Sequence, residues 1–279
     1  MNHSLSRRHI KDFPQIAIFS FDHIGLTVNL EGRYENEPLQ LIEQLTERML
    51  PESRRELSLD IGAKIGNHSL LFSRSFKKVF AFEPNPITFE ILKFNSKFAS
   101  EEKNNVPLNY GLSDKDGLLA FLVNASNIGS SRIISEDDER GKSGISDVKV
   151  KSADSIPELL EEKISLIKVD VEKHEIYALK GAENLILKNK PIIIFEQSES
   201  EIDNGSSPTI SYLKSLDYNF ATIEKNFYFG EQFYLKILSF ILRSAFGFKL
   251  RLVSKTSFKK KFYSMIVALP NSHKMPSIF

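Results

Sequence analysis

A short apolar stretch near residue 60 runs into two closely spaced glycines. The segment DIGAKIG begins at Asp60 and contains Gly62 and Gly66. Glycines at the end of a strand let the backbone turn tightly and approach a ligand, and the free N–H groups of a following helix attract a carboxylate or phosphate. The spacing Gly-x-x-x-Gly differs from the Gly-x-Gly-x-x-Gly of dinucleotide enzymes. The pattern therefore indicates a ligand-binding loop and disfavours NAD.

A second acid follows this loop along the chain. Glu83 lies 23 residues after Asp60, in the segment FEPNP. An acid at the end of the second strand, about 20 residues beyond a glycine loop, is placed to accept hydrogen bonds from both hydroxyls of a ribose. A glycine loop alone is weak evidence. The pair, with Asp60 opening the loop, predicts an S-adenosylmethionine site.

Further acids and a histidine follow two later apolar stretches. Asp170, Glu172 and His174 follow the first, and Glu196 follows the second. In a methyl transfer the protein aligns the acceptor oxygen and a base removes its proton, so all four side chains are candidate catalytic residues. Each has a structural alternative as a helix cap, a turn residue or a solvated side chain. Two carboxylates on neighbouring strands are common without metal, so no metal is expected.

Strands that alternate with helices position these residues. Such alternation predicts an α/β fold with a mostly parallel sheet and helices on both faces. Stretches such as SLIKVDV and PIIIFE are apolar on both strand faces, as central parallel strands are. The expected strands are 57–61, 78–82, 106–112, 118–123, 148–151, 165–169, 192–195, 220–223 and 262–269. The expected helices are 38–50, 67–76, 86–98, 156–161, 175–187 and 209–216.

The N-terminal part of the chain precedes this alternation. Two β-rich stretches, 16–21 and 24–30, flank Asp22-His23 and predict a β-hairpin. We therefore expect residues 1–50 to form a hairpin and helix extension, and residues 51–279 to form the main domain.

A long segment, 124–147, is rich in Ser, Gly and charge, which predicts a loop or lid. Asn127, Ser130 and Ser131 in it suit contacts to a sugar or cofactor, although the same composition describes any exposed loop.

Several short motifs occur together and in order. They are GRYE at 32–35, VFAFEPNP at 79–86, GLSDKDG at 111–117, IKVDVE at 167–172 and ALKGAE at 178–183. This set resembles the FkbM family of S-adenosylmethionine-dependent methyltransferases, which are class I methyltransferases that act mostly as O-methyltransferases. The resemblance covers about residues 32–197. It implies a Rossmann-like, seven-stranded sheet in which the sixth strand is parallel to the others and the seventh, beside it, is antiparallel.

The resemblance also implies roles for residues at the ligand edge of the sheet. Asp60 and the two glycines lie beneath the methionine and ribose, Glu83 binds the ribose hydroxyls, and Asp170 lies nearest the sulfonium and the acceptor. The cofactor-binding set is Asp60, Gly62, Lys64, Gly66, Glu83, Pro84, Asn85, Leu112, Ser113 and Asp170.

Two lysines depart from the family pattern. Lys64 stands where the family usually has Asn, and we expect it to pair with the methionine carboxylate or with an acceptor phosphate. Lys173 stands where the family usually has Gly, at a turn that often needs positive φ or close approach of a ligand. We expect Lys173 to narrow or re-aim the acceptor site.

Charge is distributed unevenly along the 279 residues, although 37 Lys and Arg nearly balance 36 Asp and Glu. After Glu231 there is no acid, and nine Lys and Arg give the last 48 residues a charge of +9. Residues 224–261 are predicted as a basic, aromatic-rich insertion between the last two strands. The stripe Phe233, Ile237, Ile241, Ala245 and Phe248 indicates a helix, on which Lys236 and Arg243 lie seven residues apart. One expectation is that this helix packs on the core or on a second subunit. The other is that it lies on the surface and contacts anionic lipid or a phosphorylated, lipid-linked sugar.

The composition excludes several classes of protein. With no cysteine, disulfides, thiolate nucleophiles and Cys-based zinc sites are excluded. The start has no secretion signal and no segment approaches a membrane span, so we expect a cytoplasmic protein, with peripheral contact at the inner membrane face through 233–261 as an option.

The preferred function is methylation of a hydroxyl on a sugar, glycolipid or other small-molecule intermediate by S-adenosylmethionine. The acceptor is a small molecule or a lipid-linked sugar, and a homodimer is left open. One alternative is a catalytically silent protein that only binds the cofactor. Nucleic-acid methylation is disfavoured, because no Asn-Pro-Pro-aromatic motif follows the fourth strand.

Overall fold

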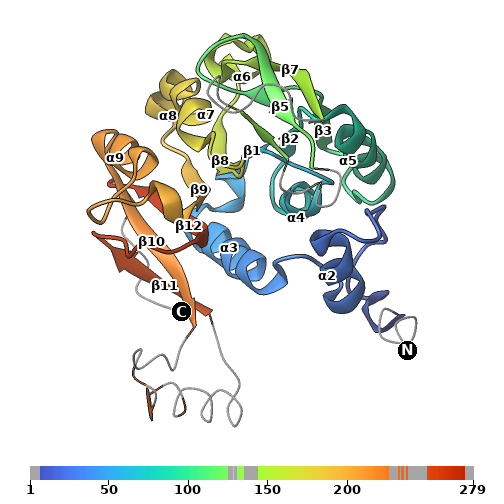
Figure 1. The fold of residues 1–279 in the computed structure, drawn as a ribbon, viewed down its shortest axis with the longest axis horizontal. Helices are drawn as coiled ribbons and strands as arrows, with labels where there is room; N and C mark the ends of the chain where they lie inside the picture. Colours follow the sequence, from blue (N-terminus) through green and yellow to red (C-terminus); the bar gives the residue numbers. More distant parts are fainter. Residues whose placement is uncertain are drawn as a thin grey trace.

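The computed structural model describes residues 7–124, 128, 131–134, 144–225, 232, 234–235, 237 and 250–273. A main sheet with the order β11-β10-β12-β9-β8-β1-β2-β3 runs through the molecule (Figure 1). Its strands are β1 (Leu57–Ile61), β2 (Lys78–Phe82), β3 (Asn105–Leu108), β8 (Ile164–Val169), β9 (Ile192–Gln197), β10 (Tyr218–Lys225), β11 (Leu250–Lys255) and β12 (Tyr263–Pro270).

Five neighbouring strands of this sheet, from β3 to β9, are parallel. β12 is antiparallel to both β9 and β10, so β10 runs in the same direction as β9. This arrangement confirms the class I methyltransferase topology. The sheet nevertheless has an eighth strand, because β11 pairs antiparallel with β10 at the edge. β11 lies inside the predicted insertion, so residues 250–255 of that insertion are sheet.

Helices cover both faces of the sheet (Figure 1). Apolar residues of α3 and α4 pack on one face, and those of α6 to α9 pack on the other. The helices are α2 (His23–Glu31), α3 (Asn36–Met49), α4 (Asn67–Ser75), α5 (Pro86–Phe98), α6 (Pro157–Leu160), α7 (Glu175–Lys180), α8 (Glu183–Asn189) and α9 (Pro208–Ser215). Short 3-10 turns occupy Arg7–His9, Glu52–Arg54, Ala153–Ser155 and Glu199–Glu201.

A second, smaller sheet has the order β4-β7-β5-β6. Its strands are β4 (Gly111–Leu112), β5 (Gly117–Leu122), β6 (Arg132–Ile133) and β7 (Ile145–Lys151). The single strand expected at 106–112 is therefore wrong, since β3 and β4 belong to different sheets. The expected helix 175–187 is likewise two helices, which separate at Gly181, where a side chain would collide with the carbonyl oxygen of Ser113.

The predicted N-terminal hairpin is wrong. Residues 24–30 belong to helix α2 instead of a strand. The Asp22 carboxylate accepts a hydrogen bond from the Ile24 N–H and so caps the helix start, and Gly32 ends the helix at φ 84°. The β-rich composition of this stretch was outweighed by these two caps.

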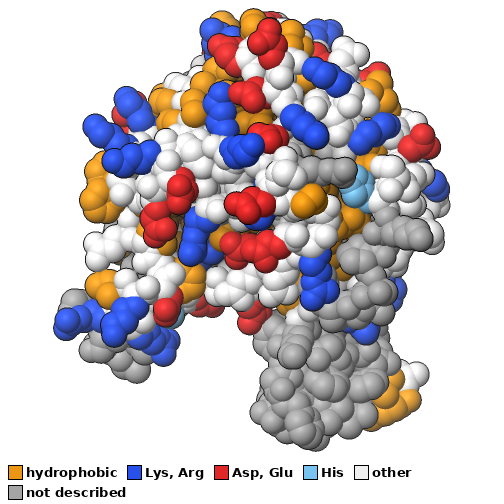
Figure 2. Space-filling model, turned by 180° about the vertical axis from the view of Figure 1, so that it is seen from behind, with side chains coloured by type: hydrophobic (Ala, Val, Ile, Leu, Met, Phe, Trp, Pro, Cys, Tyr) orange, Lys and Arg blue, Asp and Glu red, His pale blue; other side chains and the backbone are white. Residues whose placement is uncertain are grey.

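Several predictions fall outside the described residues. They are those for Asn127, Ser130, Phe233, Lys236, Ile241, Arg243, Ala245 and Phe248. Among the helices that are described, none is long and apolar enough to cross a membrane. On the face opposite to that of Figure 1, Lys, Arg, Asp and Glu side chains are interspersed (Figure 2).

Candidate active site

The loop after β1 turns tightly against β8. Gly62 has φ 78°, and a Cβ placed there would lie 1.9 Å from the Asp170 carbonyl oxygen, so only glycine fits without a shift of the backbone. Gly66 has φ 94° and immediately precedes α4. The loop therefore needs glycine at both positions that the sequence singles out.

Asp60 supports this loop from beneath. Its carboxylate is fully buried and forms an ion pair of 2.9 Å with the ammonium group of Lys168. Ser69 donates its hydroxyl to Asp60, and Lys168 donates to the Gly62 carbonyl oxygen. Asp60 thus positions the loop through its partners, and it does not itself line either of the two pockets described below.

Glu83 is held rigidly at the end of β2. Its carboxylate accepts the N–H groups of Lys64 and Asn85, each at 2.9 Å. Burial raises the pKa of Glu83 to about 7, although these two hydrogen bonds oppose the rise. Each carboxylate oxygen keeps a further acceptor site, so Glu83 is able to receive two hydroxyl groups when ionised.

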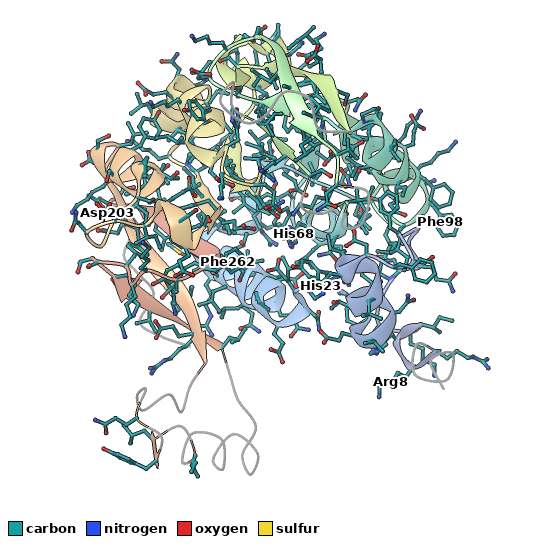
Figure 3. The ribbon with its side chains drawn as sticks, viewed as in Figure 1. Arg8, His23, His68, Phe98, Asp203 and Phe262 are labelled. Carbon is teal, nitrogen blue, oxygen red and sulfur yellow. The ribbon has the colours of Figure 1, made fainter. Side chains whose placement is uncertain are left out.

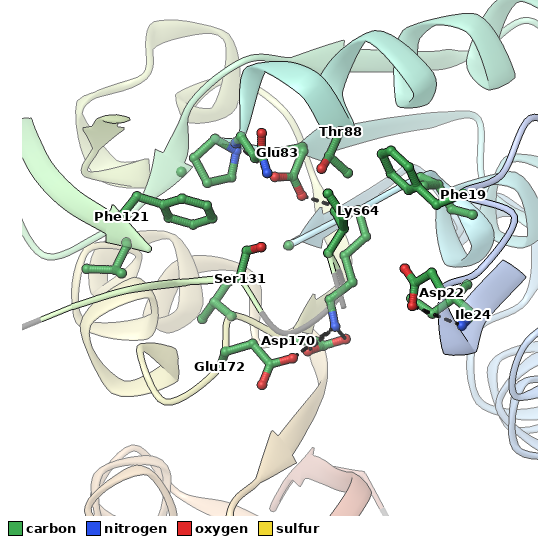
Figure 4. Close-up of a pocket in the computed structure, with 18 of the residues that line it drawn as sticks. Phe19, Asp22, Ile24, Lys64, Glu83, Thr88, Phe121, Ser131, Asp170 and Glu172 are labelled. Carbon is green, nitrogen blue, oxygen red and sulfur yellow. Dashed lines mark hydrogen bonds and ion pairs between the residues drawn. The ribbon is translucent and has the colours of Figure 1, made fainter. Parts of the chain in front are cut away.

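A first pocket opens beside this acid, and we call it the glycine-loop pocket (Figure 4). It is lined by Gly62, Lys64, Glu83, Leu112, Phe121 and Asp170, among others. Pro84 and Asn85 also line it, whereas the predicted Ser113 does not.

The glycine-loop pocket fits S-adenosylmethionine by the chemistry of its walls. The Asn85 amide nitrogen and the Thr88 hydroxyl are buried there with no hydrogen-bond partner among the described residues. Buried polar atoms of this kind need a partner, which the polar edge of a nucleoside supplies. Leu112 and Phe121 add apolar walls suited to a flat base.

A second pocket adjoins the first, and we call it the carboxylate pocket. It is lined by Tyr34, Glu35, His68, Lys168, Glu196 and Phe262, and it shares Ile24, Lys64, Asp170 and Glu172 with the glycine-loop pocket. His23, His68 and Phe262 are labelled in Figure 3 and all three line this pocket, although they come from α2, α4 and the residue before β12. The two pockets therefore share a wall that contains one cation and two acids beside Ile24.

The cation of this wall is Lys64. Its ammonium group lies 3.2 Å from carboxylate oxygens of both Asp170 and Glu172 (Figure 4). Burial alone would lower the pKa of Lys64, but these two acids raise it well above its usual range. Burial alone would likewise raise the pKa of Asp170, yet Lys64 and Lys168 hold it well below its usual range. Both side chains are therefore charged at neutral pH.

Glu196 behaves differently from its neighbours. Burial, followed by the negative charges of Asp170 and Glu172, raises the pKa of Glu196 to about 9. Its carboxyl group is thus protonated at neutral pH and is able to donate a hydrogen bond into the carboxylate pocket.

The chain matches the profile of the "Methyltransferase FkbM domain" over residues 60–250. It belongs to the FkbM methyltransferase family. The hexuronic acid methyltransferase AglP of Haloferax volcanii is 35% identical to it over 169 residues, which are 60% of this chain and 64% of that protein. The methyltransferase sdnD of Sordaria araneosa is 29% identical over 154 residues, 45% of this chain and 60% of that protein. The chain thus spans less than two thirds of the length of these relatives.

Solved structures are similar at a lower level. An FkbM methyltransferase of Methylobacillus flagellatus has a TM-score of 0.41 at 15% identity, covering 96% of this chain and 57% of its own. An O-methyltransferase of Bacillus cereus, solved in complex with SAH, has a TM-score of 0.43 at 15% identity, covering 97% of this chain and 100% of its own. The fold class follows from the strand order of the main sheet.

Lys173 shows why the FkbM pattern usually has glycine at this turn. The residue has φ 78°, in the left-handed region that favours glycine, and it follows Glu172 at φ 55°. Its N–H and that of Val171 both donate to the Glu175 carboxylate. Lys173 lines neither pocket, so the structure gives no support to the expectation that it narrows the acceptor site.

His174 and Ser113 are brought together, but outside both pockets. The Ser113 hydroxyl lies 2.9 Å from Nε2 of His174, whose ring stacks on Tyr177. Burial lowers the pKa of His174 to about 4, which keeps the ring neutral. His174 therefore lies outside both pockets, with its ring turned toward α7 and the loop after β4.

The carboxyl groups of Asp170, Glu172 and Glu196 lie close enough for a shared ion, with their nearest oxygens within 4.8 Å of one another. Such a donor set suits a hard divalent cation. Lys64 already compensates the charge of two of these acids, so in this FkbM protein the side chain that replaces the family's Asn supplies a cation from the chain itself.

Glu35 and His68 are among the residues of the carboxylate pocket that the sequence interpretation missed. Nε2 of His68 lies 3.1 Å from a Glu35 carboxylate oxygen. Glu35 ends the GRYE motif and has φ 53°, an unusual conformation for a residue with a side chain. The sequence did contain a signal for this pair, because His68 lies in the first turn of the helix that follows the glycine loop.

Proposed function

We propose that this FkbM protein is an S-adenosylmethionine-dependent methyltransferase that methylates a hydroxyl group on a sugar, glycolipid or other small-molecule intermediate. The observation that carries the proposal is the wall shared by the two pockets. A cofactor in the glycine-loop pocket and an acceptor in the carboxylate pocket would meet at Asp170 and Lys64. In-line transfer requires this kind of arrangement, with donor and acceptor held on either side of one point.

The residues of the glycine-loop pocket hold and orient the cofactor. Glu83 accepts the ribose hydroxyls, Asn85 and Thr88 pair with polar atoms of the nucleoside, and Gly62 lets the backbone approach. S-adenosylmethionine, when bound, supplies a methyl group on positively charged sulfur. Asp170, ionised beside two lysines, favours that positive charge at the junction.

The residues of the carboxylate pocket favour a hydroxyl acceptor over a carboxylate acceptor. Asp170 is ionised and Glu172 is paired with the Lys64 ammonium group, so these carboxylates accept hydrogen bonds from hydroxyls and disfavour a further carboxylate at the reacting position. The relative AglP is named for a hexuronic acid, which carries both kinds of oxygen. We therefore propose a sugar acceptor that reacts through a hydroxyl oxygen and forms a methyl ether.

Calorimetric titration with S-adenosylmethionine tests the cofactor. Because protonated Glu83 loses an acceptor site, the affinity should fall as the pH is lowered from 8 to 6, through the raised pKa of about 7. The Glu83→Gln variant should bind more weakly, by about 10-fold, and without this pH dependence. No binding by the folded wild-type protein at millimolar ligand would refute the proposal.

The product of methylation tests the acceptor. The panel consists of methyl β-D-glucuronide, methyl β-D-galacturonide and the corresponding neutral hexosides, with methyl-labelled cofactor. A methyl ether survives mild alkali, whereas a methyl ester is hydrolysed by it. We expect label that is retained after alkali, and label that is released would show transfer to a carboxylate instead.

A further inference from the structure

His68 and Glu35 form a buried pair that the proposed function has not yet used. Nε2 of His68 lies 3.1 Å from Oε2 of Glu35, and the two side chains are only 8% and 17% exposed. His68 comes from the first turn of α4, while Glu35 precedes α3, so two separate elements converge here. Both residues line the carboxylate pocket, where the acceptor is proposed to bind.

We infer that His68, oriented by Glu35, is the base that takes the proton from the acceptor hydroxyl. This inference rests on the proposed function. With Nε2 donating to the Glu35 carboxylate, Nδ1 is the ring nitrogen left to accept a proton, and it has no hydrogen bond to any residue that the structure describes. A carboxylate that fixes an imidazole in this way selects its tautomer and stabilises the imidazolium that forms.

The other titratable groups at the junction are already committed. Asp170 and Glu172 are both paired with the ammonium group of Lys64, and Lys168 is paired with Asp60. Glu196 is protonated at neutral pH, since its pKa is raised to about 9, so it is not a proton acceptor there. Among the pocket side chains that the structure describes, His68 is the imidazole that has both an acidic partner, Glu35, and a second ring nitrogen without a hydrogen bond to a described residue.

Several charged or titratable groups share the pocket with His68. They come from α2, the segment before α3, the glycine loop, β8, the turn after β8, and β9. They are His23, Tyr34, Glu35, Lys64, Lys168, Asp170, Glu172 and Glu196.

The step balances without any further reactant. The acceptor oxygen forms a bond to the methyl carbon as the carbon–sulfur bond breaks, and the electron pair of that bond stays on sulfur. The proton of the acceptor hydroxyl moves to Nδ1 of His68. Glu35 neutralises the resulting imidazolium until the proton passes to solvent.

If His68 only anchored the segment before α3 to α4, replacing a neighbouring anchor would have the same effect as replacing His68. The preceding residue, Asn67, donates its side-chain amide to the Tyr34 carbonyl oxygen at 2.9 Å, so it anchors the same segment to α4. Asn67 has no titratable group, and its substitution by Ala removes an anchor of similar position. Asn67→Ala is therefore the matched control for His68→Gln.

Steady-state kinetics with the sugar of the panel above that turns over fastest tests the inference, at saturating S-adenosylmethionine. His68→Gln should lower kcat by about 100-fold or more, and the acidic limb of its pH–rate profile should disappear. Calorimetry on the complex with S-adenosylhomocysteine should show acceptor affinity within about threefold of wild type, since the change removes a base and not a binding surface. Asn67→Ala should keep the wild-type pH profile.

Glu35→Gln supplies the second variant. Because a neutral amide no longer stabilises the imidazolium, kcat should fall by about 10-fold and the acidic limb should move to lower pH. The inference is overturned if His68→Gln keeps kcat within about fivefold of wild type with an unchanged pH profile, or if Asn67→Ala reproduces its loss. Neither result would bear on the proposed function. The proposed function is refuted instead if the wild-type protein does not bind the cofactor.

Discussion

At the scale of single residues, the junction of the two pockets is a set of charges that compensate one another. Lys64 lies between Asp170 and Glu172, and Lys168 lies between Asp60 and Asp170. Removing one member of a buried set leaves the others without compensation, which costs far more than removing a surface ion pair. Lys64 is therefore a structural requirement for this junction and not only a departure from the family pattern.

Replacing Lys64 tests this view. Lys64→Met should lower the free energy of unfolding by about 3 kcal/mol, because it leaves two partly buried acids side by side. Lys77→Met is the control, since the Lys77–Glu56 pair is also short, at 2.7 Å, but Lys77 is 64% exposed. Lys77→Met should lower the free energy of unfolding by less than about 1 kcal/mol. Urea denaturation of both variants measures the two losses. Equal losses in the two variants would contradict a compensated junction.

Glu196 predicts a pH dependence of stability. Its folded-state pKa of about 9 lies above its ordinary value of 4.5, so the folded protein keeps a proton that the unfolded chain releases. Stability from this group is therefore present below about pH 4.5 and is lost as the pH rises toward 9, by at most about 1.4 kcal/mol per pH unit.

Glu196→Gln removes this linkage while keeping the shape of the side chain. The melting temperature of the variant, relative to that of the wild type, should increase as the pH rises from 5 to 8. Other groups with a raised pKa, such as Glu83 and Glu175, affect the wild type and the variant alike, so they cancel in the difference between the two melting temperatures. A difference that stays constant across this range would show that Glu196 is ionised in the folded state.

At the scale of elements, the glycine loop joins β1 to α4 and brings the backbone against β8. Gly62→Ala should destabilise the fold by about 3 kcal/mol and weaken cofactor binding by at least about 10-fold, because the new Cβ meets the Asp170 carbonyl oxygen. Gly117→Ala is the control, since nothing lies within 4 Å of a Cβ there. It should change stability by no more than about 0.5 kcal/mol. Similar melting curves for the two variants would contradict this geometry.

The elements that were predicted correctly carry their boundary signals locally. The bounds of β1, β2 and α5 match the expected ranges, because their apolar patterns are delimited by Gly62, by the acid-proline segment at 83–86 and by Pro86 in the first helical turn. Asn85 also caps α5 with its side chain. Local signals of this kind are visible in one sequence without any knowledge of tertiary contacts.

The elements and residues that were missed depend on distant contacts. β11 becomes a strand by pairing with β10, and nothing in its own residues specifies that partner. Glu35 and His68 are 33 positions apart, and they meet only because α3 and α4 pack on the same face of the sheet. His174 illustrates the converse, since it follows β8 closely in the sequence, as Asp170 and Glu172 do, yet its ring contacts Ser113 and Tyr177 and lines neither pocket.

At the scale of the whole molecule, charge is separated between an acidic body and a basic C-terminal part. Contact with an anionic membrane or a phosphorylated acceptor through residues 233–261 stays a prediction. Within the described part of this segment, Lys259, Lys260 and Lys261 are exposed and precede Phe262, which lines the carboxylate pocket. These lysines therefore lie beside the proposed acceptor entrance.

Vesicle co-sedimentation tests that prediction. Changing Lys259, Lys260 and Lys261 to Gln should reduce recovery with anionic vesicles, since each removed cation near the surface weakens binding by about 1 kcal/mol. The control changes three exposed lysines elsewhere, Lys93, Lys97 and Lys103, and so alters the net charge equally. Equal recovery of wild-type protein with neutral and anionic vesicles would contradict membrane contact.

The central claim is that the cofactor and the acceptor meet at the wall shared by the two pockets. A crystal structure of the protein with S-adenosylhomocysteine tests it most directly. We predict ribose hydroxyls on the Glu83 carboxylate and the sulfur at the junction beside Asp170, with the carboxylate pocket open in front of it. A ligand bound elsewhere, or a sulfur turned away from Asp170 and the carboxylate pocket, would contradict the account.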